Sequence, residues 1–170
     1  DFKPAGYEFK FGSGKIDRID TCEDENRVYV KVTDYKTGMK TFDITAFYHG
    51  LQLQLMIYMD GALTVEQNKH KDKDVIPAGV FYYNIKDPMI QEKIDADIET
   101  VQEKVLKELK MNGLVLKDKE LVQKMDSSLV SIPVSFNKDG SFRKNSSVAS
   151  KEQFDILNRY VKTKISHIRQ

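Results

Sequence analysis

The sequence predicts an α/β fold in which a mixed central β-sheet is flanked by α-helices. Hydrophobic residues recur with a period of two near the N-terminus and with helical spacing further along the chain. The order strands, helix, strand, helix, followed by shorter elements, is typical of a layered α/β structure. No internal repeat or low-complexity linker divides the 170 residues, so we expect one domain over residues 1–170.

Three short strands separated by polar turns are predicted near the N-terminus. They cover residues 7–11, 15–21 and 28–36. In the third strand Val28, Val30 and Val32 share one face, because strand side chains alternate with a period of two. Asp34 and Lys36 continue that face. An apolar face that ends in two charged residues suits an active site at the rim of a sheet better than an ordinary surface strand.

The middle of the chain changes to helical spacing. Apolar residues recur at intervals of three and four over residues 45–63, which predicts one long amphipathic helix. A lysine-rich loop is expected over residues 68–74. Residues 76–85 follow it and are rich in β-branched and aromatic side chains, so they predict a strand.

A second long helix is predicted after this strand. Asp87 and Pro88 fit its N-cap and first turn, its apolar positions continue to Leu109, and Gly113 would end it. The remaining elements are shorter, apart from a closing helix. They are a helix at about 119–125, a hairpin of 129–136 with 141–143 around Asp139 and Gly140, and the closing helix over 151–168.

The charge balance does not identify a partner. The chain has 27 basic and 26 acidic side chains, which removes the simplest electrostatic argument for binding nucleic acid. Residues 143–170 are more basic, with seven basic against two acidic side chains and a net charge of +5. This tail could lie along a phosphate backbone, although a solvated helix face is the more frequent explanation of such a pattern.

Several classes of protein are disfavoured. The single cysteine, Cys22, excludes an intrachain disulfide and cannot alone form a cysteine-based zinc or iron-sulfur site. The sequence shows no signal segment and no apolar run long enough to span a bilayer, so we expect no membrane partner. Because it starts at Asp1 rather than Met, we expect a fragment of a larger cytoplasmic polypeptide.

Three polar motifs point to chemistry on phosphodiesters. Asp17 and Asp34 would lie on neighbouring strands, close enough to hold one hard divalent cation through oxygen ligands. Lys36 would place positive charge on the same face. Gln54 and Tyr58, at positions i and i+4, share one helix face that could orient Lys36 or a phosphate. Metal-assisted phosphodiester hydrolysis needs a bound metal and a cation of this kind.

In this order, Gly-x-x-Asp, Asp-Tyr-Lys and Gln-x-x-x-Tyr resemble the RecB-type nuclease branch of the PD-(D/E)XK superfamily. The similarity to the nuclease domains of AddB-type chains extends over nearly the whole sequence. It covers residues 14–20, 34–38, 48–63, 77–88 and 139–150. The resemblance implies a restriction-endonuclease-like core and a Mg²⁺-dependent exonuclease, with Mn²⁺ as a possible substitute. It also implies cleavage of single-stranded DNA beside an AddA-type helicase-nuclease subunit, during double-strand break processing for recombinational repair.

The resemblance also assigns roles to residues. Asp17 and Asp34 become metal ligands, Tyr35 offers its backbone carbonyl to the metal, and Lys36 is the catalytic lysine. An auxiliary motif is formed by Gln54 and Tyr58. The family's further metal-site residue, from an upstream helix, has no counterpart here. The family's iron-sulfur cluster, held by cysteines flanking the nuclease core, is expected in the full-length parent but not in this chain.

Other interpretations of these residues remain open. Asp34 and Lys36 could form an ordinary ion pair, Gln54 could be a satisfied polar group, and Tyr58 could be a core aromatic residue. A non-catalytic module for DNA binding or subunit docking would keep the fold without hydrolysis. A restriction-type nuclease fits the three motifs but not the similarity beyond Tyr58.

Other polar residues favour structural roles. Arg18 and Asp20 share the strand face opposite Asp17, which predicts a salt bridge, although Asp20 remains an outside candidate for the site. Residues 12–15 do not have the spacing of a phosphate loop, so no ATP site is expected. The histidines are too scattered to suggest a metal site. They are His49, His70 and His167.

Overall fold

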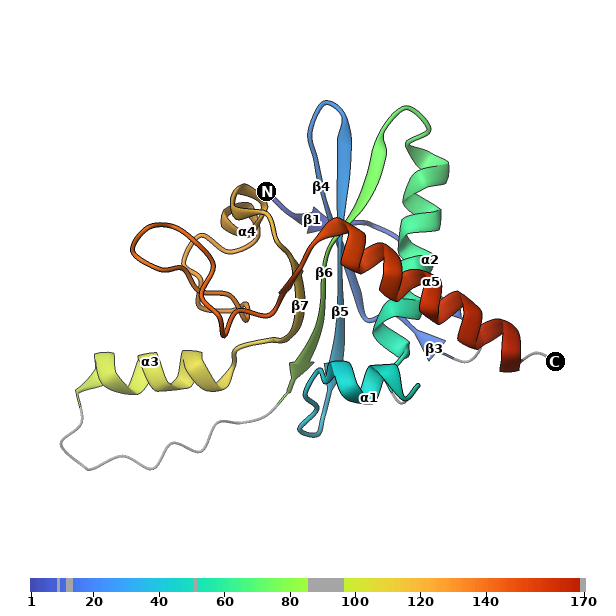
Figure 1. Cartoon of the computed structure of the whole chain (residues 1–170). Coiled ribbons are helices and arrows are strands. Elements are labelled where there is room, and N and C mark those ends of the chain that lie inside the picture. The colour runs from blue at the N-terminus through green and yellow to red at the C-terminus, as the bar shows by residue number, and fades with distance from the viewer. Residues whose placement is uncertain (9, 12–13, 51, 86–96, 169–170) are drawn as a thin grey trace.

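The computed structural model describes residues 1–170 except 9, 12–13, 51, 86–96 and 169–170 (Figure 1). Within these residues a six-stranded sheet has the order β1-β4-β5-β6-β7-β8. Its strands are β1 (Lys3–Pro4), β4 (Arg18–Glu23), β5 (Arg27–Lys36), β6 (Asp74–Asn84), β7 (Asn112–Leu116) and β8 (Val148–Ala149). β5 pairs with β4 antiparallel and with β6 parallel, so the predicted mixed sheet is confirmed.

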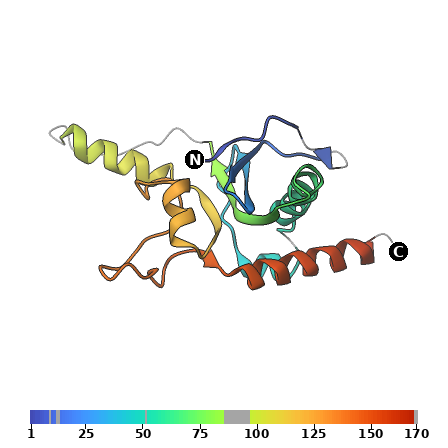
Figure 2. The same ribbon diagram turned by 90° about the horizontal axis from the view of Figure 1, so that it is seen from above.

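Helices lie on both sides of this sheet (Figures 1 and 2). α2 (Gln54–Lys69) packs on β5 and β6, and α5 (Lys151–Ile168) packs beside it. α4 (Lys119–Met125) lies on the other side, against β7. α1 (Ile44–Tyr48) precedes α2, and α3 (Ile98–Glu108) extends away from the sheet and buries none of its side chains.

The alternation of β5 explains why the sheet has two cores. Val28, Val30 and Val32 are fully buried on the face toward α2, where they belong to the larger hydrophobic cluster or border it. A smaller cluster on the other face gathers around Phe81 and Val115, beneath α4 and the segment that follows it. This second cluster involves β6 and β7, not the β4 and β5 part of that face.

The single helix predicted over residues 45–63 is wrong, because the chain forms two helices. Asp43 caps α1 by accepting a hydrogen bond from the Thr45 N–H at 2.8 Å. Gly50, with φ of +79°, donates its N–H to the Phe47 carbonyl and ends α1, since glycine adopts this left-handed conformation at little cost. α2 then begins at Gln54 and continues past the predicted end, to Lys69.

The second predicted helix also differs. Asp87 and Pro88 lie outside the described residues, whereas Asp97 is the N-cap of α3 and accepts a hydrogen bond from the Thr100 N–H. Gly113 does not end a helix but lies in β7, where an added Cβ would overlap the Val80 carbonyl oxygen. The close approach of β6 therefore explains this glycine.

The predicted strands are largely confirmed, with one interruption. The strand expected at 15–21 breaks around Ile16 and Asp17. Its first part, β3 (Gly14–Lys15), pairs with β2 (Lys10–Phe11) in a separate ribbon, while β4 joins the main sheet.

The C-terminal elements follow the prediction closely. α4 and α5 have the expected bounds. The hairpin reduces to a bridge between Phe136 and Phe142, while the residues before it form no strand and contribute Ile132 and Val134 to the smaller core.

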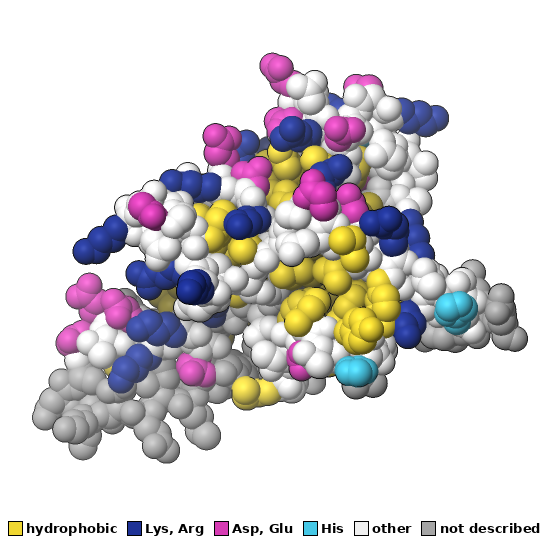
Figure 3. Space-filling view, in the orientation of Figure 1, with side chains coloured by type: hydrophobic (Ala, Val, Ile, Leu, Met, Phe, Trp, Pro, Cys, Tyr) yellow, Lys and Arg dark blue, Asp and Glu magenta, His cyan; other side chains and the backbone are white. Residues whose placement is uncertain are grey.

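The surface mixes charged and apolar side chains. In Figure 3, yellow side chains gather on the face that carries α1 and α5. Exposed residues there include Ile44, Tyr48 and Ile156. In the part of the chain that the structure describes, no helix has the length and apolar character needed to cross a membrane.

Candidate active site

The end of β5 brings two carboxylates together. The register of β4 and β5 pairs Arg18 with Thr33, so one residue further Asp17 comes opposite Asp34. Asp17 Oδ2 accepts a hydrogen bond from the Tyr35 N–H at 2.8 Å. Asp17 thus lies within hydrogen-bond reach of the Asp34 carboxyl, as predicted from the two motifs.

Asp34 is buried without full compensation. Only 3% of it is exposed, and its Oδ2 lies 2.6 Å from Lys36 Nζ. That contact is an ion pair without hydrogen-bond geometry, since Oδ2 has no hydrogen-bond partner among the described residues. Burial raises the pKa of Asp34, and Asp17 raises it further, while Lys36 opposes both.

Lys36 is held from a second side. Its Nζ donates to Gln54 Oε1 at 3.1 Å, and Gln54 Nε2 donates to the Tyr58 hydroxyl at 2.8 Å. Gln54 is the first residue of α2, and Tyr58 is buried one turn later. The α2 N-terminus therefore orients the lysine through one amide side chain, in the arrangement that the i, i+4 spacing indicated.

One residue at this centre was missed by the sequence analysis. The parallel register of β5 and β6 places Tyr82 opposite Asp34. The Tyr82 hydroxyl is buried and has no hydrogen-bond partner among the described residues. Burial, followed by the charges of Asp34 and Tyr58, raises the pKa of Tyr82 to about 12. Only the register between β5 and β6 would have revealed this position.

A hard divalent cation fits this donor set. Two adjacent carboxylates, one with a buried oxygen that accepts no hydrogen bond, repel each other unless a cation lies between them. No group of three or more His, Cys, Asp or Glu able to hold a metal occurs among the described residues. The described donors are therefore Asp17, Asp34 and the backbone at Tyr35, whose side chain turns to the other face of the sheet.

The remaining sequence candidates lie elsewhere. Asp20 faces away from Asp34 and forms the predicted salt bridge with Arg18 at 2.9 Å, together with a second one to Lys31 at 3.1 Å. His70 lies 3.4 Å from Glu66 at the far end of α2. These contacts are structural and do not reach the carboxylate pair.

Comparison with known proteins gives a consistent result. A family model described as the PD-(D/E)XK nuclease superfamily matches residues 1–170. The chain is 37% identical over 195 residues to a protein of Clostridioides difficile (strain 630) that is named as the second, or B-type, subunit of an ATP-dependent helicase/deoxyribonuclease. That match covers 98% of this chain and 17% of the relative.

Two further relatives carry the same name. The protein of Clostridium kluyveri (strain NBRC 12016) is 38% identical over 178 residues, covering 99% of this chain and 15% of the relative. The protein of Clostridium novyi (strain NT) is 40% identical over 186 residues, covering 95% and 16% respectively. The chain thus spans about one sixth of the length of these curated relatives.

Proposed function

The chain belongs to the PD-(D/E)XK nuclease superfamily, and on that premise we propose that it is the nuclease domain of a helicase-nuclease. In this role it hydrolyses phosphodiester bonds of single-stranded DNA, as an exonuclease, in the cytoplasm. The reaction belongs to the processing of double-strand breaks for recombinational repair. The observation that carries the proposal is the buried, incompletely compensated Asp34 carboxylate between Asp17 and Lys36.

In the proposed site Asp17, Asp34 and the Tyr35 backbone carbonyl hold Mg²⁺, for which Mn²⁺ can substitute. The bound cation supplies a polarised phosphoryl oxygen and an activated water. Asp17 is fixed for this task by the Tyr35 N–H, which leaves its carboxylate beside Asp34. The two carboxylates thereby set where the scissile phosphate sits.

Lys36 stabilises the charge that develops on the phosphate. Its ammonium is held by Asp34 on one side and by Gln54 on the other, so it is oriented before substrate arrives. Preorganised positive charge lowers the barrier because it need not reorient during the reaction. Tyr58 fixes the Gln54 amide and so acts on the lysine through one intermediate residue.

The names of the relatives support proposals about the whole protein. These names describe one subunit of a helicase/deoxyribonuclease, and we infer an AddA-type helicase-nuclease subunit as the partner. The full-length parent is also proposed to carry the iron-sulfur cluster expected from the family. Single-stranded ends released by unwinding would be the substrate.

The proposal is tested by cleavage of a labelled single-stranded DNA with Mg²⁺ or Mn²⁺. Asp34→Ala is expected to lower the rate by about 10³-fold or more, because the metal site and its electrostatic stabilisation are lost together. Asp155→Ala, which removes an exposed carboxylate from α5, is the matched control and should cleave like the wild type. Equal cleavage by Asp34→Ala and wild type would contradict the proposal. Binding of DNA without any cleavage by the wild type would instead support the non-catalytic DNA-binding or subunit-docking function.

A further inference from the structure

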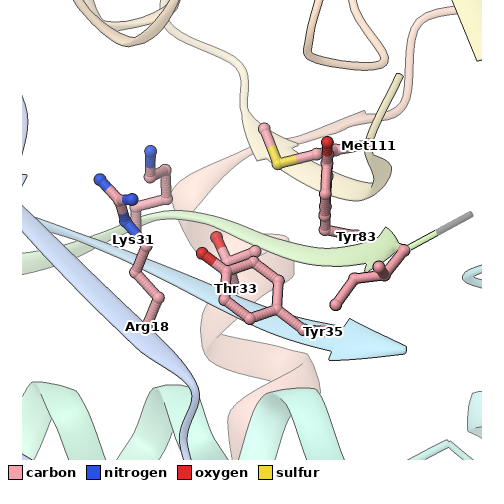
Figure 4. A pocket seen from close by; sticks show the side chains of 7 residues that line it. Arg18, Lys31, Thr33, Tyr35, Tyr83 and Met111 are labelled. Carbon is pink, nitrogen blue, oxygen red and sulfur yellow. The ribbon is translucent and has the colours of Figure 1, made fainter. Parts of the chain in front are cut away.

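A second feature lies on the face of the sheet opposite α2. A pocket of about 440 Å³ opens there, above the ends of β4, β5 and β6 (Figure 4). Its lining includes Arg18, Lys31, Thr33, Tyr35, Tyr83 and Met111. Strand register explains the grouping, since Arg18 pairs with Thr33 and Tyr35 pairs with Tyr83. A pocket of this volume is in the range that holds a small organic group.

One end of the pocket is basic. Arg18 and Lys31 share a single buried carboxylate, Asp20, so two cations face one anion. Arg18 Nε donates to both oxygens of Asp20, at 2.9 and 3.0 Å, while 48% of its side chain stays exposed. Asp20 therefore positions the two cations, and the cluster keeps a net charge of +1.

The other end of the pocket is aromatic. The rings of Tyr35 and Tyr83 have centroids 5.8 Å apart and planes at 74°, an edge-to-face arrangement. This contact fixes both rings without stacking them in parallel, so at most one ring face is covered by the pair. Tyr35 is 38% exposed. Exposed, fixed aromatic rings beside cations are the features by which proteins hold unpaired bases and their phosphates.

The pocket and the carboxylate pair are built on the same strand ends. Arg18 directly follows Asp17, and Tyr35 lies between Asp34 and Lys36. Because side chains alternate along a strand, these neighbours point to opposite faces of the sheet. A nucleic-acid strand bound at the carboxylates can therefore reach the pocket by passing around the end of β5.

We propose that this pocket is a nucleotide subsite for the single strand that is cut, with a phosphate at Arg18 and Lys31 and a base against Tyr35 and Tyr83. The proposal rests on the proposed nuclease function, because it takes the occupant to be part of the same substrate. It adds a binding site remote from the metal and assigns its two halves to the phosphate and the base.

The test measures binding of a fluorescein-labelled oligothymidylate by fluorescence anisotropy in EDTA, where no cleavage occurs. Tyr83→Leu is expected to weaken binding about tenfold, since stacking on one aromatic ring is lost, whereas Tyr83→Phe should bind like the wild type. A duplex of the same length should not distinguish these variants, because its paired bases cannot reach the rings. Thermal unfolding of each variant checks that the fold is retained.

The basic end is tested by the salt dependence of the same binding. Arg18→Gln should reduce the slope of log affinity against log salt by about one, as expected for one lost phosphate contact. Arg27→Gln, at the opposite end of β5, is the matched control and should keep the wild-type slope. Unchanged single-strand affinity in Tyr83→Leu together with an unchanged slope in Arg18→Gln would overturn the proposal. Since these measurements need no divalent cation, they can fail or succeed independently of the Asp34→Ala cleavage test.

Discussion

Two buried carboxylates on opposite faces of one sheet differ in how their charge is compensated. Asp20 and Asp34 are 1% and 3% exposed. Asp20 accepts two hydrogen bonds from Arg18 and a further ion pair from Lys31. Asp34 has one ion pair with Lys36, an oxygen that accepts no hydrogen bond among the described residues, and a second carboxylate beside it.

The difference shows that burial alone does not indicate a reactive acid. A buried charge is tolerated when donors surround it, as at Asp20, and such a group is part of the architecture. Asp34 lacks this compensation, so the fold holds an electrostatically costly group at that position. Polar groups left unsatisfied in a native structure suggest a missing ligand, which here is the proposed cation.

The largest effects are expected from matched substitutions at these two acids. Asp34→Asn should lower cleavage by about 10³-fold and leave the free energy of unfolding unchanged or raise it by about 1 kcal/mol, because an uncompensated charge is removed. Asp20→Asn should cost about 2 kcal/mol of stability, because Lys31 and Arg18 lose their shared partner. Cleavage at saturating DNA should survive in Asp20→Asn.

Urea unfolding and cleavage rates, measured on both variants, check this pair. If Asp34→Asn lost stability as Asp20→Asn does, Asp34 would be an ordinary structural ion pair, and the contrast between the faces would disappear.

A smaller effect is expected from two tyrosines that approach the same centre. The Tyr58 hydroxyl accepts from Gln54, whereas the Tyr82 hydroxyl has no partner among the described residues. Tyr58→Phe should lower the cleavage rate about tenfold, since the amide that holds Lys36 loses its anchor. Tyr82→Phe should keep the rate and raise stability by about 1 kcal/mol, because a buried unsatisfied hydroxyl is removed.

Single-turnover rates at saturating DNA separate these variants, and thermal unfolding measures their stability. Equal rates for Tyr58→Phe and wild type would show that Gln54 does not position the lysine. The metal-free affinity for DNA should be the same in both variants, which excludes an effect through binding.

The sequence was sufficient to group the side chains that local periodicity controls. Asp34 and Lys36 were placed on one face by strand alternation, and Gln54 with Tyr58 by helical spacing. The structure brings these residues together with Asp17.

What the sequence could not supply depends on long-range register. Tyr82 reaches Asp34 only because β5 and β6 pair in parallel, with a register shift between Val30 and Lys31. Gly113 was misinterpreted for the same reason, since its need for a small residue comes from Val80 on β6. The pocket requires the facing of three strands at once. Local errors such as the helix break at Gly50 arose because a left-handed glycine overrode an apolar pattern that continued through it.

The smallest expected effect concerns a third carboxylate, Asp126, which neutral donors compensate. Burial acts to raise its pKa, but the hydroxyls and N–H groups of Ser128 and Ser131 outweigh burial and lower the pKa from 3.8 to about 2. A lowered pKa in the folded state contributes stability above pH 4, and that contribution is lost as the pH falls toward 2. Because Asp126 is partly exposed, we expect the loss to be about 1 kcal/mol.

Urea unfolding at several pH values between 5 and 2 checks this, with Asp126→Asn and the exposed Asp155→Asn compared with the wild type. Asp126→Asn should be less stable at pH 5 and should lose less stability on acidification, while Asp155→Asn should follow the wild type. Parallel pH profiles for all three proteins would mean that four neutral donors do not compensate a carboxylate as the two cations at Asp20 do. Compensation by neutral donors would then no longer count as evidence that an acid is structural, and the contrast with Asp34 would rest on its cationic neighbours alone.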